Sequence, residues 1–282
     1  MFKINKLHPA LAVEIEGIDL ASQNDYACIS FIRKTLVENN VIVLRSQKLT
    51  PAQQISISSK FGPLAVHIVS QFNMDNFPEI LILSNDKNTK GESVGIEDAG
   101  RYWHTDMSYL AKPSLGSILY AIEVPAYGGD TMFASMYSAY DALPGFRKKE
   151  LSNLRAIHYF ASRWEGEKNK SSIRPSMTKE QIEKTPPVDH PLIRTHPENG
   201  RKAIYAGGFT VGILDFDTKK AKQLLEELTL FSTQKQFVYR HKWQAGDIVF
   251  WDNRSTMHHA LPYDNKYRRH MHRTTVKGDK PV

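Results

Sequence analysis

The spacing of apolar residues near the N-terminus predicts a helix followed by a buried strand. In "DYACISFIRKTLVENN" (25–40), Ile29, Ile32 and Leu36 recur at helical intervals, and the paired asparagines at the end are a typical helix stop. The next run, "VIVLR" (41–45), is short, apolar and β-branched. These are the properties of a strand that is buried on both faces.

A second helix is predicted from its start signal. Thr50 precedes Pro51 as an N-cap residue precedes a proline at the first helical position, and Gln53 stands where a capping box needs it. We expect this helix to end near Gly62.

From there the pattern becomes strand-like and is often broken by turns. Short runs rich in β-branched and aromatic residues lie at 79–84, 117–124, 130–135, 202–207, 236–243, 247–251 and 272–276. One helical run, "KAKQLLEELTLF" (220–231), interrupts them. Strands with flanking rather than alternating helices predict an α+β fold, mainly β, built as an antiparallel sandwich or barrel. No glycine-rich phosphate loop is present.

Two segments have the composition of loops. Residues 85–101 are polar, contain glycine and lead directly into a histidine at 104, whereas residues 161–191 are charged and rich in proline. Long loops in a compact domain often cover active sites. For the second segment a tolerated surface insertion is an equal alternative.

Composition describes a globular chain without special targeting features. Of its residues, 41% are apolar and 24% charged, and no run approaches the length of a membrane span. The N-terminus lacks the apolar core and cleavage site of a signal peptide. The single cysteine, Cys28, excludes an internal disulfide, so a reducing cytoplasm is the expected compartment.

The formal net charge of +7 raises the question of an anionic partner. Lys and Arg are scattered, and the densest cluster is "KYRRHMHR" (266–273). Composition alone leaves three interpretations of it: a solvated basic surface, an anion-binding site, or a nucleic-acid contact.

The stretch "WHTD" (103–106) supplies candidate chemistry. If it is a strand, His104 and Asp106 point to the same side, with Thr105 opposite. A histidine and a carboxylate together are two of the three ligands of the facial triad that binds non-haem Fe(II). His258 and His259, in "WDNRSTMHHA", are adjacent, so only one of them can face inward from a strand. Spacing does not choose between these and the other histidines, at 8, 67, 158, 190, 196, 241, 270 and 272.

Four ordered motifs carry a resemblance to a known family. They are "WHTD" (103–106), "GGDT" (128–131), "WDNRSTMHHA" (251–260) and "YRRHMHRTT" (267–275). The chain resembles the taurine dioxygenase and dichlorophenoxyacetate dioxygenase family of Fe(II)- and 2-oxoglutarate-dependent oxygenases, from about residue 7 to the C-terminus. The resemblance implies one domain over 1–282 with a double-stranded β-helix (jelly-roll) core flanked by helices, and active-site loops at 85–101 and 161–191.

The resemblance also implies roles for individual residues. His104, Asp106 and His258 would hold Fe(II), and 2-oxoglutarate and O2 would take the remaining positions. Arg269 corresponds to the arginine that binds the far carboxylate of 2-oxoglutarate, a role that suits its planar guanidinium. Thr131 corresponds to the hydroxyl that assists it. A plain strand threonine is the alternative at that position.

The positions that the resemblance assigns to substrate binding each allow more than one role. Arg273 shares a strand face with Arg269, so it would bind either an anionic substrate or the cosubstrate, while His270 and His272 would point away. His67 falls at a substrate-contacting histidine of the sulfonate-oxidising members, and Phe160 at an aromatic wall of the pocket. A strand-end polar residue and a core phenylalanine are the alternatives.

Two positions depart from the taurine-specific pattern. Ser70 replaces a tyrosine, and Gly100 replaces an asparagine. Both are substrate-side positions, which speaks against taurine itself as the substrate.

The implied reaction is hydroxylation of a small organic anion, a sulfonate or a carboxylate, with release of succinate and CO2. A homo-oligomer, dimer or tetramer, is expected, with neither nucleic acid nor membrane as a partner. The enzyme alternative is a zinc hydrolase with the same three ligands, since these also suit catalytic zinc. The non-enzyme alternative is an anion or nucleic-acid binder that uses the basic cluster.

Overall fold

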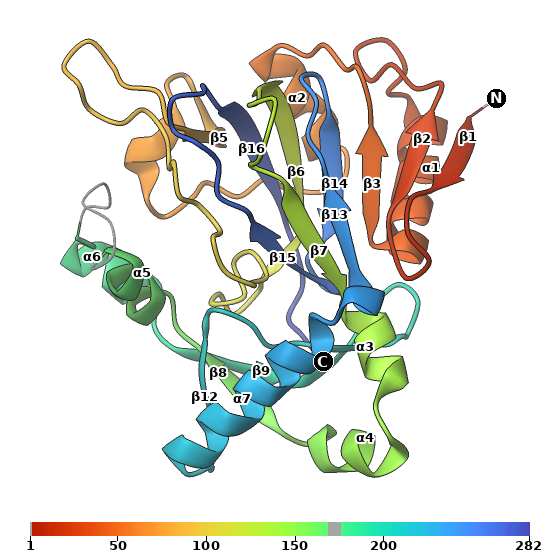
Figure 1. The fold of residues 1–282 in the computed structure, drawn as a ribbon, viewed down its shortest axis with the longest axis vertical. Coiled ribbons are helices and arrows are strands. Elements are labelled where there is room, and N and C mark those ends of the chain that lie inside the picture. Colours follow the sequence, from red (N-terminus) through yellow and green to blue (C-terminus); the bar gives the residue numbers. More distant parts are fainter. Residues whose placement is uncertain (1, 169–175) are drawn as a thin grey trace.

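The computed structural model describes residues 2–168 and 176–282, and its largest sheet has eight strands (Figure 1). Their order across the sheet is β1 (Lys3–Lys6), β2 (Val13–Glu16), β3 (Val41–Leu44), β14 (Ile248–Asp252), β6 (Ser114–Glu123), β16 (His270–Lys277), β5 (Phe77–Ser84) and β4 (Asn73–Met74). Neighbouring strands are antiparallel except for the parallel pair β2 and β3. Strands from both ends of the chain therefore meet in the centre of one sheet.

The two faces of this sheet bury different partners. Along β6 and β14, Leu119 and Val249 belong to one apolar cluster, whereas Ile118 and Phe250 belong to another. This alternation follows from the two-residue period of a strand. Helices α1 (Tyr26–Asn39) and α2 (Pro51–Ser59) contribute to the second cluster and cover that face.

A three-stranded antiparallel sheet covers the first face. It consists of β13 (Val238–His241), β7 (Thr131–Ser135) and β15 (Thr256–Ala260), in that order. Phe133 of β7 packs against Trp251 of β14, with 5.4 Å between their ring centroids. The site described below lies between these two sheets.

Smaller elements pack beyond the three-stranded sheet. They are the sheet β12 (Thr210–Ile213), β8 (Arg155–His158) and β9 (Val188–Pro191), the pair β10 (Ile193–Thr195) and β11 (Lys202–Ile204), and helices α3 (Met136–Ala142), α4 (Gly145–Leu151), α5 (Phe160–Lys168), α6 (Lys179–Lys184) and α7 (Thr218–Ser232). A third apolar cluster joins α3 and α7 to β11 and to Met257 of β15. Helices α4 and α7 lie at the bottom of Figure 1, away from α1.

The predicted helix signals are confirmed. Asp25 caps α1 by accepting from the Cys28 backbone, and Asn40 ends it with φ at 68°. The capping box of Thr50 and Gln53 is present, although α2 ends at Ser59 rather than near Gly62. Strands occur in every predicted run with shifted ends, and residues 235–237 form a 3-10 turn before β13.

The segment 161–191 is not the loop that its composition predicts. It contains most of α5, all of α6, and β9, while residues 169–175 lie outside the described part of the chain. These elements could not be predicted from the polar, proline-containing sequence, because each is too short to produce a clear hydrophobic pattern. Residues 85–101, in contrast, are irregular as predicted, apart from an isolated bridge between Lys87 and Ser93. Within the described ranges, no helix combines the length and apolarity needed to cross a membrane.

Candidate active site

Two backbone hydrogen bonds join the "WHTD" segment to β15. The His104 amide donates to the His258 carbonyl at 3.0 Å, and the His258 amide donates to the His104 carbonyl at 2.8 Å. The strand considered for 103–106 does not form, because the pairing stops at His104 and the chain turns at Asp106 and Met107, with the φ of Met107 at 55°. The two side chains nevertheless converge, held by the bridge and the turn.

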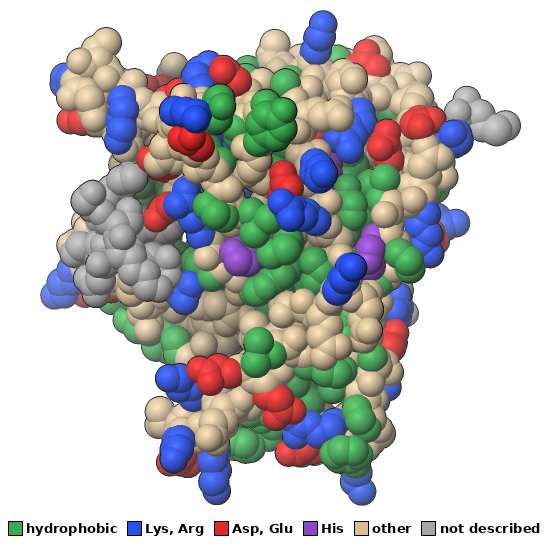
Figure 2. Space-filling view, viewed as in Figure 1, with side chains coloured by type: hydrophobic (Ala, Val, Ile, Leu, Met, Phe, Trp, Pro, Cys, Tyr) green, Lys and Arg blue, Asp and Glu red, His purple; other side chains and the backbone are tan. Residues whose placement is uncertain are grey.

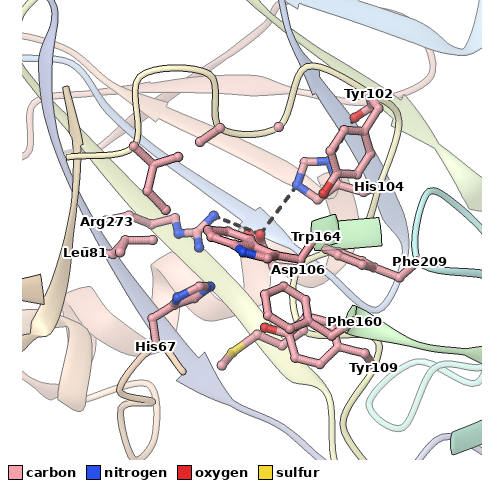
Figure 3. Close-up of a pocket in the computed structure, with 14 residues that line it drawn as sticks. His67, Leu81, Tyr102, His104, Asp106, Tyr109, Phe160, Trp164, Phe209 and Arg273 are labelled. Atoms are coloured by element: carbon pink, nitrogen blue, oxygen red, sulfur yellow. Dashed lines mark hydrogen bonds and ion pairs between the residues drawn. The ribbon is translucent and has the colours of Figure 1, made fainter. Parts of the chain in front are cut away.

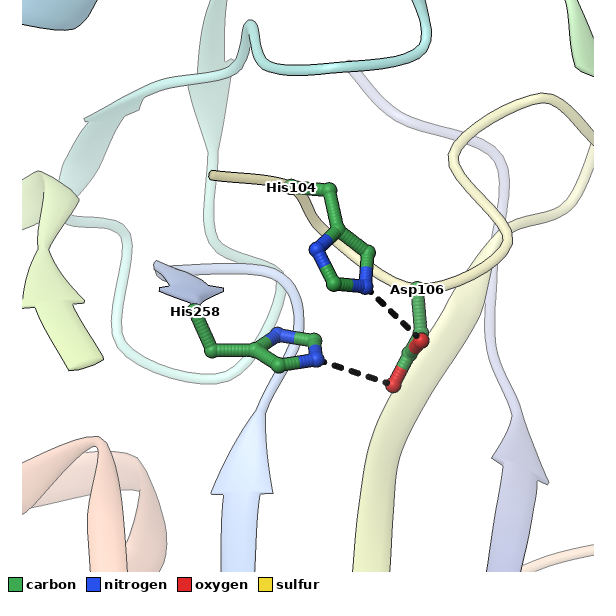
Figure 4. A group of neighbouring side chains, drawn as sticks. All are labelled: His104, Asp106 and His258. Atoms are coloured by element: carbon green, nitrogen blue, oxygen red, sulfur yellow. Dashed lines mark ion pairs between the residues drawn. The ribbon is translucent and has the colours of Figure 1, made fainter. Parts of the chain in front are cut away.

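The side chains of His104, Asp106 and His258 face one another at this point (Figure 4). The Nε2 atoms of His104 and His258 lie 3.6 and 3.8 Å from the two carboxylate oxygens of Asp106. All three residues are buried, and one ligand atom from each lies within 4.8 Å of the others. These separations exceed hydrogen-bond lengths, so the atoms surround a shared point rather than bonding to one another. In the described part of the chain, this is the one such group of histidine and acidic side chains.

Each of the two histidines directs its Nε2 atom toward Asp106. The Nδ1–H of His104 donates to the Tyr102 carbonyl at 2.9 Å, which leaves the Nε2 lone pair facing Asp106. Burial, together with the charges of His104 and Arg273, holds the pKa of His258 well below its usual value. The Nδ1 atom of His258 has no hydrogen-bond partner among the described residues.

The carboxylate of Asp106 is held in its anionic form. Burial alone would raise the pKa of Asp106, but Arg273 and the two histidines hold it well below its usual range. The Nη1 of Arg273 donates to Oδ1 at 2.8 Å, and the hydroxyl of Ser117 donates to Oδ2 at 2.7 Å. A carboxylate beside two imidazole nitrogens fits a divalent cation such as Fe(II).

Asn253 supports Asp106 from behind and was missed in the sequence. Its Oδ1 accepts from the Asp106 amide at 3.3 Å and from the Trp251 indole at 2.9 Å. Its Nδ2 donates to the hydroxyls of Ser114 and Ser117 at 2.9 Å each. The asparagine lies inside the "WDNR" motif, so position was the available signal, but the sequence does not state which way the side chain points.

Two cavities meet at the three-residue cluster. We call the first the arginine cavity, and it is lined by Leu83, Ala99, Gly100, His104, Leu119, Thr131, Trp251, His258, Ala260, Arg269 and Arg273. We call the second the aromatic cavity, and it is lined by His67, Leu81, Ile96, Ala99, Gly100, Tyr102, His104, Asp106, Met107, Tyr109, Phe160, Trp164, Phe209 and Arg273. His104 and Arg273 belong to both, so a metal held here would be reached from either cavity.

The arginine cavity contains a buried cation that has no acidic partner in the described part of the chain. Arg269 is 6% exposed, burial lowers its pKa to about 10, and its Nε has no hydrogen-bond partner among the described residues. Thr131, at the start of β7, faces the same cavity. A desolvated guanidinium is costly unless an anion pairs with it, which fits a carboxylate ligand at this end.

The aromatic cavity has a volume of about 460 Å³ including its opening, and its walls combine apolar and aromatic side chains with His67, Asp106 and Arg273. Phe160 packs on Tyr109 with ring centroids 4.4 Å apart and lies edge-on to His67 at 6.2 Å. Figure 3 shows Arg273 on one side of Asp106 and the rings of Phe160 and Tyr109 on the other. The predicted pocket positions His67, Phe160 and Arg273 are thus brought together.

The two positions that depart from the taurine-specific pattern differ in placement. Ser70 is exposed on the 3-10 turn Ser70–Phe72 and lines neither cavity. Gly100 lines both cavities with φ at 70°, and a Cβ there would lie 2.8 Å from Cε1 of His104. Gly100 is therefore constrained by the ligand histidine as well as by its own backbone.

The basic cluster at 266–273 is divided between ion pairs and the cavity. Lys266 pairs with Asp264, and Arg268 pairs with Asp86 and Glu123. The cluster's other two arginines line the arginine cavity, while His270 and His272 bond to each other at 2.9 Å, away from it. On the face drawn in Figure 2, Lys and Arg side chains are interspersed with Asp and Glu. This arrangement favours buried anion binding over a nucleic-acid surface.

Comparison with known proteins gives a consistent result. The family model described as "Taurine catabolism dioxygenase TauD, TfdA family" matches residues 3–275. The chain is 36% identical over 290 residues to the alpha-ketoglutarate-dependent 2,4-dichlorophenoxyacetate dioxygenase of Cupriavidus pinatubonensis, covering 99% of this chain and 98% of the relative. It is 30% identical to the (S)-phenoxypropionate/alpha-ketoglutarate-dioxygenase of Sphingobium herbicidovorans, covering 99% and 96%.

The fold is also found among solved structures. The crystal structure of AAD-2 in complex with Mn(II) and N-oxalylglycine superposes with a TM-score of 0.83 at 30% identity. The match covers 100% of this chain and 99% of that one. The whole chain, rather than a segment around the cluster, is therefore similar to these proteins.

Proposed function

The chain belongs to the TauD/TfdA family and is a 2-oxoglutarate-dependent dioxygenase, and from this premise we propose which of its residues hold iron, cosubstrate and substrate. The proposed reaction is hydroxylation of a small organic anion with an apolar body, accompanied by release of succinate and CO2. The observation that carries the assignment is the buried cluster of His104, Asp106 and His258 between two cavities, each with an arginine.

We propose that these three side chains are the Fe(II) ligands. Two imidazoles and one carboxylate are the donor set of the facial triad, which leaves open positions on the metal. When bound, Fe(II) with 2-oxoglutarate and O2 supplies the oxidising power of the reaction. The protein supplies ligation, orientation and exclusion of water.

The arginine cavity is the proposed cosubstrate site. Arg269 binds the far carboxylate of 2-oxoglutarate, and the hydroxyl of Thr131 donates to the same carboxylate. Support comes from the burial of Arg269 without an acidic partner, since an anion there removes the cost of an isolated charge. The keto-acid end would then reach the metal past His258.

The aromatic cavity is the proposed substrate site. Phe160 and its neighbouring rings hold an apolar body, and Arg273 and His67 face the anionic group. Arg273 also donates to Asp106, so it links the substrate's charge to the metal carboxylate. The named substrates of the two relatives, 2,4-dichlorophenoxyacetate and phenoxypropionate, combine an aromatic body with a carboxylate, which supports the same substrate class here.

The zinc-hydrolase alternative is not favoured. A hydrolase needs a general base near the metal-bound water, and the described lining of the two cavities offers no carboxylate besides Asp106, which leaves His67 as the one histidine outside the ligand set. It would also leave Arg269 unexplained. The non-enzymatic alternative is likewise disfavoured by the inward direction of the arginines.

Further proposals concern architecture and surroundings. We propose that the eight-stranded and three-stranded sheets form the jelly-roll core of a single domain over 1–282. The loop 85–101 covers the site through Ile96 and Gly100, and the segment 161–191 covers it through Trp164 of α5. A cytoplasmic location, supported by the single Cys28, and a homodimer or homotetramer without nucleic-acid or membrane partners complete the proposal.

An anaerobic titration with Fe(II) and 2-oxoglutarate tests the assignment directly. The wild-type protein should develop the visible charge-transfer band of the iron–2-oxoglutarate chelate, and Asp106→Ala should not. Absence of the band in the wild type would overturn the proposal. Succinate formation with aryloxy carboxylates, alkyl carboxylates and sulfonates, each compared with its neutral amide, then identifies the substrate class.

A further inference from the structure

Trp243 contacts the cosubstrate side of the site through a single hydrogen bond. It lies between β13 and β14, is 9% exposed, and its indole N–H donates to the hydroxyl oxygen of Thr131 at 3.0 Å. Trp243 does not itself line the arginine cavity, whereas Thr131 does. The indole is therefore placed behind the threonine, on the side away from the ligand space.

This bond determines whether the Thr131 hydroxyl remains free to donate a hydrogen bond to a ligand. A hydroxyl has one proton to donate and can accept through its lone pairs. Because the indole can only donate, Thr131 must accept in this contact, and its own proton remains available. No described residue accepts that proton, and the side chain faces the cavity that contains Arg269.

The indole is held in place by a rigid chain of neighbours. Its ring lies edge-on to the imidazole of His241, with centroids 4.5 Å apart and planes at 84°. His241 is fully buried, and its two nitrogens contact Asp247 Oδ2 and the Tyr239 hydroxyl, each at 3.0 Å. The next residue, Gln244, donates its amide to the same Asp247 oxygen at 2.9 Å. Trp243 thus has little freedom to turn its N–H away from Thr131.

On the basis of the proposed function, we infer that Trp243 is a positioning residue for 2-oxoglutarate. By donating to Thr131, it occupies one lone pair of the threonine hydroxyl, fixes the orientation of that hydroxyl, and leaves its proton to be donated to the far carboxylate. Arg269 supplies the charge at that carboxylate, and Thr131, set by Trp243, supplies a directed neutral donor. A tryptophan that never touches the ligand thereby contributes to selection of a keto acid with a second carboxylate.

Direct binding measurements with Trp243→Phe test this inference. The change keeps an aromatic ring against His241 and removes the N–H. Under anaerobic conditions with Fe(II), the Kd for 2-oxoglutarate should rise by about three- to tenfold, the range expected for one hydrogen bond. The Kd for 2-oxobutyrate, which has the keto-acid end but lacks the far carboxylate, should not change. Equal weakening of both ligands, or of neither, would overturn the inference.

A double-variant cycle separates positioning from general packing. In a Thr131→Val background, Trp243→Phe should cause no further loss of 2-oxoglutarate affinity, because its effect passes through the hydroxyl. In the Thr131→Ser background, which keeps a hydroxyl, the loss should return. Additive effects in the valine background would show that Trp243 acts by another route.

Matched controls keep the outcomes distinct. Tyr120→Phe also removes a buried aromatic donor, to the Gln47 carbonyl at 3.1 Å, but on the other face of the sheet, so it should leave both Kd values unchanged. If Trp243→Phe does not fold, unchanged 2-oxoglutarate binding by Thr131→Val would itself overturn the inference. A wild-type protein that binds no 2-oxoglutarate would instead overturn the proposed function.

Discussion

Arg273 and Asp106 form a buried ion pair, with the Nη1 of the arginine 2.8 Å from Oδ1 of the carboxylate. The two residues come from distant parts of the chain, β16 and the turn after His104. Arg273 also lines both cavities, so one side chain contacts the metal carboxylate, the proposed substrate space and the proposed cosubstrate space. Substitutions of Arg273 should therefore show how much this residue contributes to stabilising the Asp106 carboxylate and how much it contributes to ligand binding.

Arg273→Gln should destabilise the metal-free protein and make it more dependent on metal. Removing one member of a buried ion pair costs about 3–5 kcal/mol, because the other charge is left without a partner. A bound divalent cation restores a partner for Asp106. In thermal unfolding, the increase in Tm on adding Mn(II) should be larger for Arg273→Gln than for the wild type. An equal increase would show that the ion pair does not support Asp106.

Ser117→Ala should weaken metal binding without affecting the fold elsewhere. The Ser117 hydroxyl donates to Asp106 Oδ2 and receives a bond from Asn253, so its loss frees the carboxylate to rotate. Losing such a support typically lowers metal affinity by about 10–100-fold. The Kd for Mn(II) checks this. Ser58→Ala, which removes an equally buried hydroxyl contact to Thr274, is the control and should leave that Kd unchanged.

Gly100→Ala and Gly91→Ala should have similar costs in backbone strain but different effects on metal. Both glycines lie in the 85–101 loop with positive φ, at 70° and 78°, where a side chain costs about 1–2 kcal/mol. Only at Gly100 would the new Cβ press on His104, 2.8 Å from its Cε1, since nothing lies within 4 Å at Gly91. Gly100→Ala should therefore lose Mn(II) affinity, while Gly91→Ala keeps it. Equal metal affinity in the two variants would contradict the close contact.

Arg269→Met should separate stability from cosubstrate binding. The buried guanidinium has no acidic partner in the described chain, so an apolar side chain of similar length should not lower the Tm of the ligand-free protein. Loss of the partner for the far carboxylate should cost about 2–5 kcal/mol in 2-oxoglutarate binding. The rise in Tm on adding 2-oxoglutarate should disappear.

The neighbouring arginine supplies the control for that experiment. Arg268 is exposed and pairs with Asp86 and Glu123 instead of facing the cavity. Arg268→Met should therefore keep the stabilisation by 2-oxoglutarate. If both variants lost it, the effect would have to be assigned to general charge near β16 rather than to Arg269.

The sequence predicted the elements better than the local geometry of the site. Alternation and capping signals are properties of neighbouring residues, so α1, β3 and the capping box of α2 could be read directly. The sequence pointed to convergence of the side chains of His104 and Asp106, but through the geometry of a strand that does not form. A turn built on Met107 at positive φ brings them together, and a methionine gives no local signal for that conformation.

Contacts between distant segments explain the remaining misses. Asn253 and Trp243 act through hydrogen bonds to residues more than one hundred positions away, which spacing cannot reveal. Ser70 lies three residues before the first residue of β4, in a turn that exposes it to solvent, although its position in the sequence suggested the pocket. Gly100 was expected at a substrate-contacting position, but a Cβ added there would lie closest to the ring of His104.

The stability of the protein should fall between pH 6.5 and pH 5 because of His158. Burial, with the nearby His190, lowers the pKa of His158 from 6.5 to about 3. Below pH 6.5 the unfolded chain binds a proton at this residue that the folded protein does not. The folded state is therefore favoured above pH 6.5 and loses stability as the pH falls toward 3.

The size of this effect follows from the difference in bound protons. One proton corresponds to about 1.4 kcal/mol per pH unit, so lowering the pH from 6.5 to 5 should cost about 2 kcal/mol at this site. His158→Asn removes the titrating group, and its free energy of unfolding in urea should depend less on pH by that amount. His8→Asn, at a partly buried histidine whose pKa is also lowered but by a smaller shift, should reduce the pH dependence by less than His158→Asn does. An unchanged slope in His158→Asn would show that other buried groups, not His158, set the acid sensitivity.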